Sequence, residues 1–112
     1  MGVGMASVAA ATAVLGYDLA KDTIWQSSAH DRALTGFGIK GSAAANDTKV
    51  SLYVDNVKIG EFYNTDTGFP NMDNVIPLSG NYVPKNSDIH VYVDDAPATN
   101  PINIIVVWQE LD

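Results

Sequence analysis

Residues 49–64 read KVSLYVDNVKIGEFYN, and they hold the clearest structural signal in the chain. Apolar and polar side chains alternate from Val50 to Val54, which is the period of a strand with one buried face. The alternation resumes from Val57 to Tyr63. Between the two runs stands Asp55-Asn56, a pair that tolerates the positive φ angles of a tight turn. The stretch therefore predicts a β-hairpin.

Five further β-like runs lie on either side of the hairpin, separated by residues typical of turns. They are Thr23–Ser27, Leu34–Ile39, Val75–Leu78, Ser87–Val93 and Ile102–Trp108. Pro77 cannot donate a hydrogen bond to a neighbouring strand, so its run is expected at a sheet edge. In the fourth run, Ile89, Val91 and Val93 are expected to point inward. The last run is apolar on both faces, which indicates a central strand covered on both sides.

About seven strands, with turn signals between them and no helical pattern after residue 22, predict an all-β fold. We expect an antiparallel β-sandwich or a small barrel. Asn64–Asn74 is rich in Asn and Asp and contains Gly and Pro, so it is expected to be a loop. The length of 112 residues fits one globular domain, and 46% hydrophobic residues can supply its core.

The first part of the chain differs from the rest. Residues 2–16 read GVGMASVAAATAVLG, and no charged residue precedes Asp18. The run is similar to the apolar region of a secretory signal, but no Lys or Arg precedes it, and we expect it to stay on the molecule. Fifteen residues in a helix would cover about 22 Å, which is less than the hydrocarbon core of a membrane at about 30 Å.

We therefore expect residues 1–22 to form an apolar N-terminal arm ahead of a β-sandwich domain over residues 23–112. The arm either packs on its own domain or reaches onto a neighbouring subunit or into a membrane-proximal layer, because apolar surface left in water is unfavourable. Its Gly and Ala residues would let the backbone approach another surface closely. Membrane contact is expected only through residues 2–16.

Acidic residues outnumber basic ones by 13 to 6, which gives a net charge of −7. Phosphate contacts need a basic patch, so no nucleic-acid partner is expected. Docking on anionic lipid is disfavoured for the same reason. The chain has no Cys, which excludes disulfides, a thiolate nucleophile and a Cys-ligated metal.

Two histidines, His30 and His90, are the first candidates for catalysis. Ser27-Ser28 and Asp31 flank His30, but residues adjacent in the chain point away from one another, and no GxSxG turn occurs. We expect His30 to lie in a surface turn and His90 to be exposed beside Tyr92 on the polar face of its strand. The sequence assigns no catalytic, cofactor-binding or metal-ligating residue. The chain is not expected to be an enzyme or to need a cofactor.

Calcium is the metal that the loops could hold, since Asp and Asn oxygens suit hard cations. Asp66–Asp73 and Asp94-Asp95 are the two acidic clusters. Neither has the EF-hand spacing, and Asp-rich turns are common without any metal. Asn46–Thr48 is an N-x-T sequon, which matters only if the chain passes through a glycosylating secretory route. Calcium is therefore a candidate and not an assignment.

Aromatic residues raise carbohydrate binding as an alternative, because aromatic platforms on a β-sandwich can stack sugars. The candidates are Trp25, Trp108, Tyr53, Tyr63, Tyr82 and Tyr92. The competing interpretation, which we favour, has the tryptophans in the core and the tyrosines on pleated sheet surfaces, as their β propensity predicts.

Four runs of the sequence carry a resemblance to a known class of proteins. They are KVSLYVDN (49–56), VKIGEFYN (57–64), SDIHVYVDD (87–95) and INIIVVWQEL (102–111). Behind a short arm, this pattern resembles the single jelly-roll or β-sandwich subunits of viral coats, such as minor capsid, penton and decoration proteins. Secreted filament subunits joined by donor strands are similar on the same grounds, but such subunits normally lose a signal peptide.

The resemblance implies a jelly-roll-like sandwich that serves as a structural subunit, in a virion capsid or at a virion surface. Its partners would be copies of itself or other coat proteins, joined through sheet edges and the arm. The acidic balance favours a position that faces outward or faces protein and not a packaged genome. The alternative is a small carbohydrate-binding or adhesion module, extracellular or on a cell surface, with calcium as a candidate stabiliser.

Overall fold

The predicted hairpin forms as β3 (Lys49–Val54) and β4 (Val57–Tyr63), which pair antiparallel. Its turn contains Asp55, whose φ angle of 52° is of the kind that the sequence predicts there. Val50 and Leu52 are fully buried, so the alternation along β3 directs these apolar side chains into the core. The hairpin prediction is confirmed.

The structure is a computed structural model, and it describes residues 2–9, 11–42, 44–64, 68, 75–97, 99 and 101–111. Seven strands lie within these residues, and each pairs antiparallel with its neighbours. Besides β3 and β4, they are β1 (Gly2–Val8), β2 (Arg32–Gly41), β5 (Ile76–Val83), β6 (Ile89–Asp95) and β7 (Ile102–Glu110).

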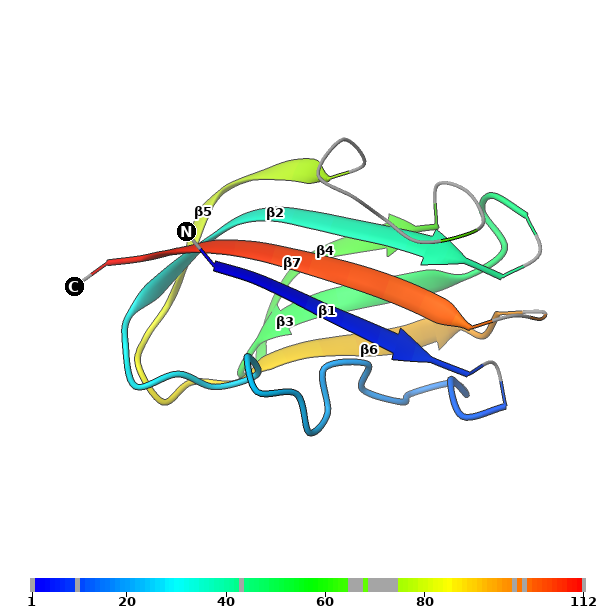
Figure 1. Cartoon of the computed structure of the whole chain (residues 1–112), viewed down its shortest axis with the longest axis horizontal. Coiled ribbons are helices and arrows are strands. Elements are labelled where there is room, and N and C mark those ends of the chain that lie inside the picture. Colours follow the sequence, from blue (N-terminus) through cyan, green and yellow to red (C-terminus); the bar gives the residue numbers. More distant parts are fainter. Residues whose placement is uncertain are drawn as a thin grey trace.

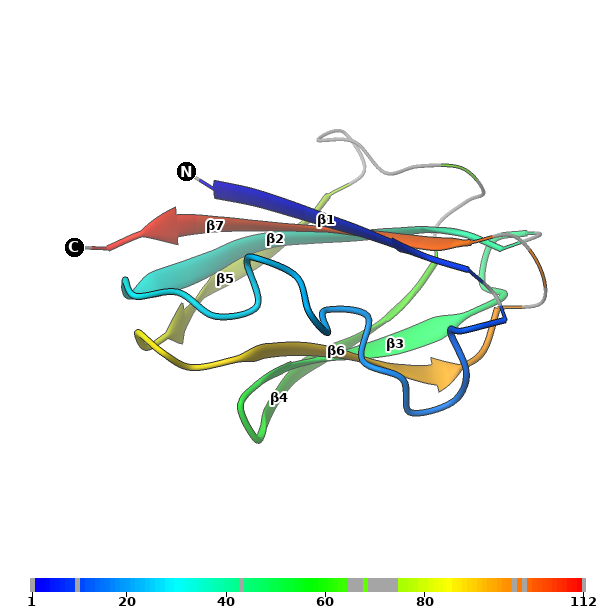
Figure 2. The ribbon, with the colours of Figure 1, turned by 60° about the horizontal axis from the view of Figure 1, so that its bottom comes forward.

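The strands form two sheets that face each other in a β-sandwich (Figures 1 and 2). The four-stranded sheet has the order β1-β7-β2-β5, and the three-stranded sheet has the order β4-β3-β6. Residues 16–19 run along the remaining edge of β6, where Leu19 N–H donates to the Val91 carbonyl at 2.7 Å and Asp18 bridges to Tyr92. With this extended segment as an eighth member, the connectivity is jelly-roll-like, as predicted.

The core lies between the two sheets and is formed by side chains on their inner faces. Its fully buried large side chains include Phe37, Leu34, Ile39, Leu52, Ile89, Ile102, Ile104, Val50, Val83 and Val91. The ring of Phe37 in the four-stranded sheet lies 4.7 Å from the ring of Phe62 in the three-stranded sheet. Ile89, Val91 and Val93 all point inward, which confirms the prediction for β6.

β7 is an interior strand, between β1 and β2, and it is covered on both faces. Ile104 and Val106 are buried in the core, while Ile105 and Val107 on the opposite face are only 3% exposed each. Val75 contributes to the outer cover, since it fills the space that a side chain at Gly36 would need, beside Val107. The prediction of a central strand covered on both sides is confirmed.

Two of the predicted runs differ in the structure. Val75–Leu78 was expected as a short edge strand, and β5 does lie at the edge of the four-stranded sheet but continues to Val83. The strand predicted over Thr23–Ser27 is wrong. Those residues form turns, in which Thr23 N–H and Oγ1 both donate to the Ala20 carbonyl, at 3.2 and 2.8 Å. Local turn bonds thus outweigh the β propensity of the run.

The N-terminal segment packs on its own chain. β1 pairs with β7 along its whole length, from Gly2 opposite Trp108 to Val8 opposite Ile102. Further along, Ala13, Leu19 and Ala20 are buried in the same core as the other strands. The arm was expected either on its own domain or on a neighbouring subunit, and in this chain it packs on its own domain. Contact with a neighbouring subunit stays a prediction.

Gly4 allows β1 to lie directly on Trp25. A side chain at Gly4 would place its Cβ 2.5 Å from the Trp25 ring, which is closer than atoms can approach. We predict that Gly4→Ala lowers the free energy of unfolding by about 1–3 kcal/mol, the usual cost of overpacking a filled core. Denaturant unfolding measures it. Ser7→Ala, at an exposed position of the same strand, is the control and should change little.

Candidate functional site

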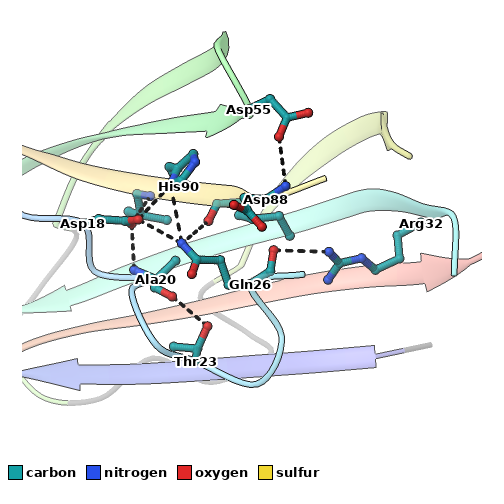
Figure 3. Close-up of polar contacts among 10 residues, drawn as sticks. Asp18, Ala20, Thr23, Gln26, Arg32, Asp55, Asp88 and His90 are labelled. Atoms are coloured by element: carbon teal, nitrogen blue, oxygen red, sulfur yellow. Dashed lines mark hydrogen bonds and ion pairs between the residues drawn. The ribbon is translucent and has the colours of Figure 1, made fainter. Parts of the chain in front are cut away.

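A connected group of polar side chains lies where the segment between β1 and β2 meets β6 (Figure 3). His90 and Tyr92 stand on the outer face of β6, because their neighbours Ile89, Val91 and Val93 are buried in the core. Asp18 reaches this face from the extended segment that runs along the edge of β6. The site therefore combines residues that lie about seventy positions apart in the chain.

The Asp18 carboxylate is the centre of this group. Its Oδ1 accepts hydrogen bonds from the backbone N–H of Ala20 at 3.0 Å and of Val91 at 2.9 Å. Its Oδ2 accepts one from Gln26 Nε2 at 2.9 Å and lies 2.8 Å from His90 Nδ1. Both oxygens are thus engaged twice, which accounts for most of the acceptor capacity of a carboxylate.

Gln26 links the far end of the same segment to β6. Its Nε2 donates to the Ile89 carbonyl at 3.1 Å, and the Ile89 N–H donates back to the Gln26 carbonyl at 2.8 Å. Gln26 therefore satisfies the backbone of β6 where a neighbouring strand would otherwise do so. Together with Asp18, it fixes the irregular segment on the open edge of the three-stranded sheet.

His90 is less exposed than the sequence predicts. Its side chain is 21% exposed and that of Asp18 is 14% exposed, and the two form an ion pair when the imidazole is protonated. The expectation of an exposed His90 is wrong because Asp18 comes from a distant segment that covers this face. The contacts of His90 in the described part of the chain are with Asp18, Gln26 and Tyr92, none of which is a serine or cysteine nucleophile.

Aromatic rings continue from His90 across the outer face of the three-stranded sheet. The His90 and Tyr92 rings are stacked with centroids 5.3 Å apart, and Tyr53 on β3 meets Tyr92 edge-on at 5.4 Å. Burial raises the pKa of the Tyr92 phenol, and the negative charge of Asp18 adds to that rise. We call Tyr53, Tyr92 and His90 the aromatic row.

Three charged groups on the hairpin, those of Asp55, Lys49 and Glu61, are held by direct contacts. Asp55 accepts a hydrogen bond from the Asp88 backbone N–H at 3.0 Å, which lowers the pKa of the Asp55 carboxyl (Figure 3). On the outer face, Lys49 Nζ lies 2.7 Å from Glu61 Oε1, and this contact lowers the pKa of Glu61 and raises that of Lys49. The hydrogen bond of Asp55 and the ion pair of Lys49 with Glu61 lie at the surface and stabilise the sheet only modestly.

His30 and the residues that flank it in the chain lie at the surface, in the connection that leads into β2. His30 is exposed in a bend, as predicted, and its backbone N–H donates to Ser28 Oγ at 3.1 Å. Asp31 accepts a hydrogen bond at 2.8 Å from the backbone N–H of Lys85, which lies in the turn between β5 and β6. Ser28 is thus bonded to a backbone group, and Asp31 is bonded both to a backbone group and to the side chain of Tyr82.

Trp25 belongs to the core, as the favoured interpretation expects, whereas Trp108 is only partly buried. Trp25 is 6% exposed, and its Nε1 donates to the Met5 carbonyl at 3.3 Å. Trp108 packs against the core cluster, with the Arg32 guanidinium 5.4 Å from its ring centroid. Arg32 is 1% exposed and its Nη1 donates to the Trp25 carbonyl at 2.6 Å.

Arg32 is the buried residue that the sequence analysis missed. Burial lowers the pKa of its guanidinium, and the charge of Glu110 opposes that effect. The alternation of the strand could have indicated this burial, because Arg32 is two residues before the inward-facing Leu34 and so shares its face. Its charge made a buried position unexpected.

The acidic clusters give no assembled metal site among the residues that the structure describes. Asp94 Oδ2 accepts a hydrogen bond from Ser51 Oγ, and the Asp95 carbonyl accepts one from Thr48 Oγ1 at 2.5 Å. In the described ranges, no three His, Cys, Asp or Glu side chains come together in a way that could hold a metal ion. Asp66–Asp73, apart from Gly68, lies outside the described residues, so calcium binding there stays a prediction.

Two hollows are associated with the side edges of the sandwich. A groove of about 300 Å³ lies between β4 and β5, lined by Val54, Asp55, Val57, Ile59, Asn81, Tyr82 and Pro84. A second hollow of about 260 Å³ lies at the start of β1, where Val3, Ile24, Trp25 and Trp108 meet. Because β1 and β5 are opposite edges of the four-stranded sheet, the hollows lie on opposite sides of the molecule.

Comparison with protein-family models and with curated proteins found no match for this chain. In the part of the chain that the structure describes, no helix has the length and apolar character that crossing a membrane requires.

We predict that Asp18→Ala lowers the free energy of unfolding by about 1–3 kcal/mol, because it leaves partly buried backbone and side-chain donors without an acceptor. The loss should also raise amide hydrogen exchange at Val91, whose N–H bonds to Asp18. Lys21→Ala, at an exposed position of the same segment, is the matched control. Equal stability of the two variants would show that the Asp18 contacts contribute nothing.

Proposed function

We propose that this protein is a structural subunit of a larger protein assembly, in a virion capsid or at a virion surface. Its partners in this proposal are copies of itself or other coat proteins. The observation that supports it is the distribution of exposed apolar side chains, which gather along the two opposite side edges of the sandwich. The predicted resemblance to viral coat subunits supplies the virion setting.

The first apolar side follows β1 and the segment after it. Its exposed large side chains are Val3 (49%), Met5 (51%), Val14 (54%), Leu15 (72%) and Ile24 (98%). We call these five residues the β1-side strip. Single exposed apolar residues are ordinary on soluble proteins, but a strip of them along one edge is typical of a surface that a partner covers.

The second apolar side is the groove between β4 and β5. Val57 is 67% exposed and Tyr82 is 55% exposed, and both line this groove. A subunit with apolar surface on two opposite sides can contact two neighbours at once. Repetition of such contacts builds rings, sheets or shells.

The net charge of the chain is compatible with a subunit that contacts other proteins. At a net charge of −7, a face turned toward a packaged genome would repel the phosphates. Contacts with other protein subunits carry no such penalty where they are apolar. The proposal therefore has the subunit facing outward or facing protein.

The mass of the full chain in solution tests the proposal. Light scattering after size exclusion, at several protein concentrations, should show a defined particle heavier than one chain, and electron microscopy should then show its shape. A monomer at every concentration, also in the presence of candidate coat proteins, would contradict the proposal.

A charged residue in the groove tests whether the second side is used. Val57→Asp places a carboxylate on an exposed apolar position and should lower the particle mass. Asn56→Asp adds the same charge at the neighbouring exposed turn position and should leave the mass unchanged. Circular dichroism of both variants checks that the fold is intact.

The alternative proposal, a carbohydrate-binding or adhesion module, has the aromatic row as its supporting observation, because aromatic rings on a sheet face can stack sugars. It predicts binding on a glycan array that Tyr53→Ala removes and Tyr63→Ala, on the neighbouring strand, retains. It also predicts a melting temperature that falls on chelation if calcium contributes. Absence of binding to every glycan on the array would contradict this alternative.

A further inference from the structure

We propose that two copies of this chain join through their β1 strands, antiparallel about a two-fold axis, so that their four-stranded sheets form one continuous sheet. The inference rests on the proposed function and deepens it, since it names the partner at the β1 edge as a second copy of the chain.

β1 is a regular strand with one side unpaired in the described part of the chain. It pairs with β7 residue by residue, without a register shift, and it is the first strand of its sheet. Trp25 packs under Gly4 and donates to the Met5 carbonyl, which holds the strand in place.

The other sheet edges among the described residues carry devices that prevent strand addition. β5 contains Pro77, which has no N–H to donate, and Gly80 with a φ angle of 82° breaks its regular geometry. β4 carries an ion pair between Lys58 and Glu61 at 3.3 Å. The free edge of β6 is covered by residues 16–19.

β1 carries none of these devices. Its sequence GVGMASV has no charged residue and no Pro. Edge strands without charge, Pro or a bulge pair readily with another strand. Between two copies, the β1 edges are therefore the ones that fit each other best, and a self-complementary edge leads to a two-fold dimer.

The β1-side strip fits the same arrangement. Ile24 lies at the start of β1, where it shares a hollow with Val3. Val14 and Leu15 follow shortly after the end of β1, and the chain then turns back along the strand (Figures 1 and 2). An antiparallel pair sets the start of one β1 against the end of the other. Ile24 of each copy would thus meet Val14 and Leu15 of the other copy.

Charge does not oppose the contact, although each copy carries −7. The first charged residue after β1 is Asp18, whose carboxylate is 14% exposed and faces His90. Lys21 and Asp22 on the following turn are exposed and have opposite signs. Two copies therefore bring no excess of like charges together along this edge.

Engineered cysteines test the pairing directly, because the chain has none of its own. Met5 is at the middle of β1 with a 51% exposed side chain, so a register centred on it places the two copies of residue 5 opposite each other. Met5→Cys should give a disulfide-linked dimer on mild oxidation. Leu111→Cys, at a position 49% exposed beyond β7, should stay monomeric on a non-reducing gel.

A charge at the same position tests the contact without a cross-link. Met5→Lys puts two like charges across the two-fold axis and should halve the mass of the dimer in light scattering. Leu111→Lys is the control and should keep the dimer. Circular dichroism should show that both variants fold, since both positions are exposed.

The outcomes separate this inference from the function on which it rests. A particle that persists in Met5→Lys and gives no Met5→Cys cross-link overturns the β1 pairing but leaves the structural role in place. A dimer linked at residue 5 that never grows larger supports the pairing and counts against a larger assembly. A full chain that is monomeric at every concentration and does not cross-link overturns both.

Discussion

The pairing of β7 with β1 on one side and β2 on the other is the interaction on which the rest of the sandwich depends. It joins the beginning, the first third and the end of the chain in one sheet. Because β7 is apolar on both faces, it has to lie inside its sheet, and other parts of the chain must cover both of these faces. The core side chains Ile104 and Val106 then meet the inner face of the three-stranded sheet.

The three-stranded sheet reaches its full width through an irregular segment instead of a fourth strand. Asp18 and Gln26 satisfy the edge of β6 with a carboxylate, an amide and a few backbone groups. This arrangement covers one edge with polar contacts that a partner chain could not easily displace. β1, in the opposite layer, keeps a regular backbone and apolar flanks. The contrast between these two neighbouring edges is the reason for proposing that copies of the chain join at β1.

Much of the fold follows from local pattern. The alternation in β3 and β6 fixed which side chains point inward, and the turn at Asp55 needed only residues that accept a positive φ angle. Patterns of this kind fail where local turn bonds, or a contact with a distant segment, decide the outcome. Thr23–Ser27 has strand-like composition but forms turns, and His90 looks exposed by period but is covered by Asp18.

The sequence by itself determined the all-β class, the hairpin, the inward faces and the interior position of β7, because these depend on period and on residues near one another in the chain. Only the tertiary structure decided that residues 2–8 are an edge strand on β7, that Arg32 is buried against Trp108, and that Asp18 meets His90. The physical reason is the same in each case. These contacts join residues that lie far apart in the chain and meet only through the pairing of distant strands and segments, which no local preference decides.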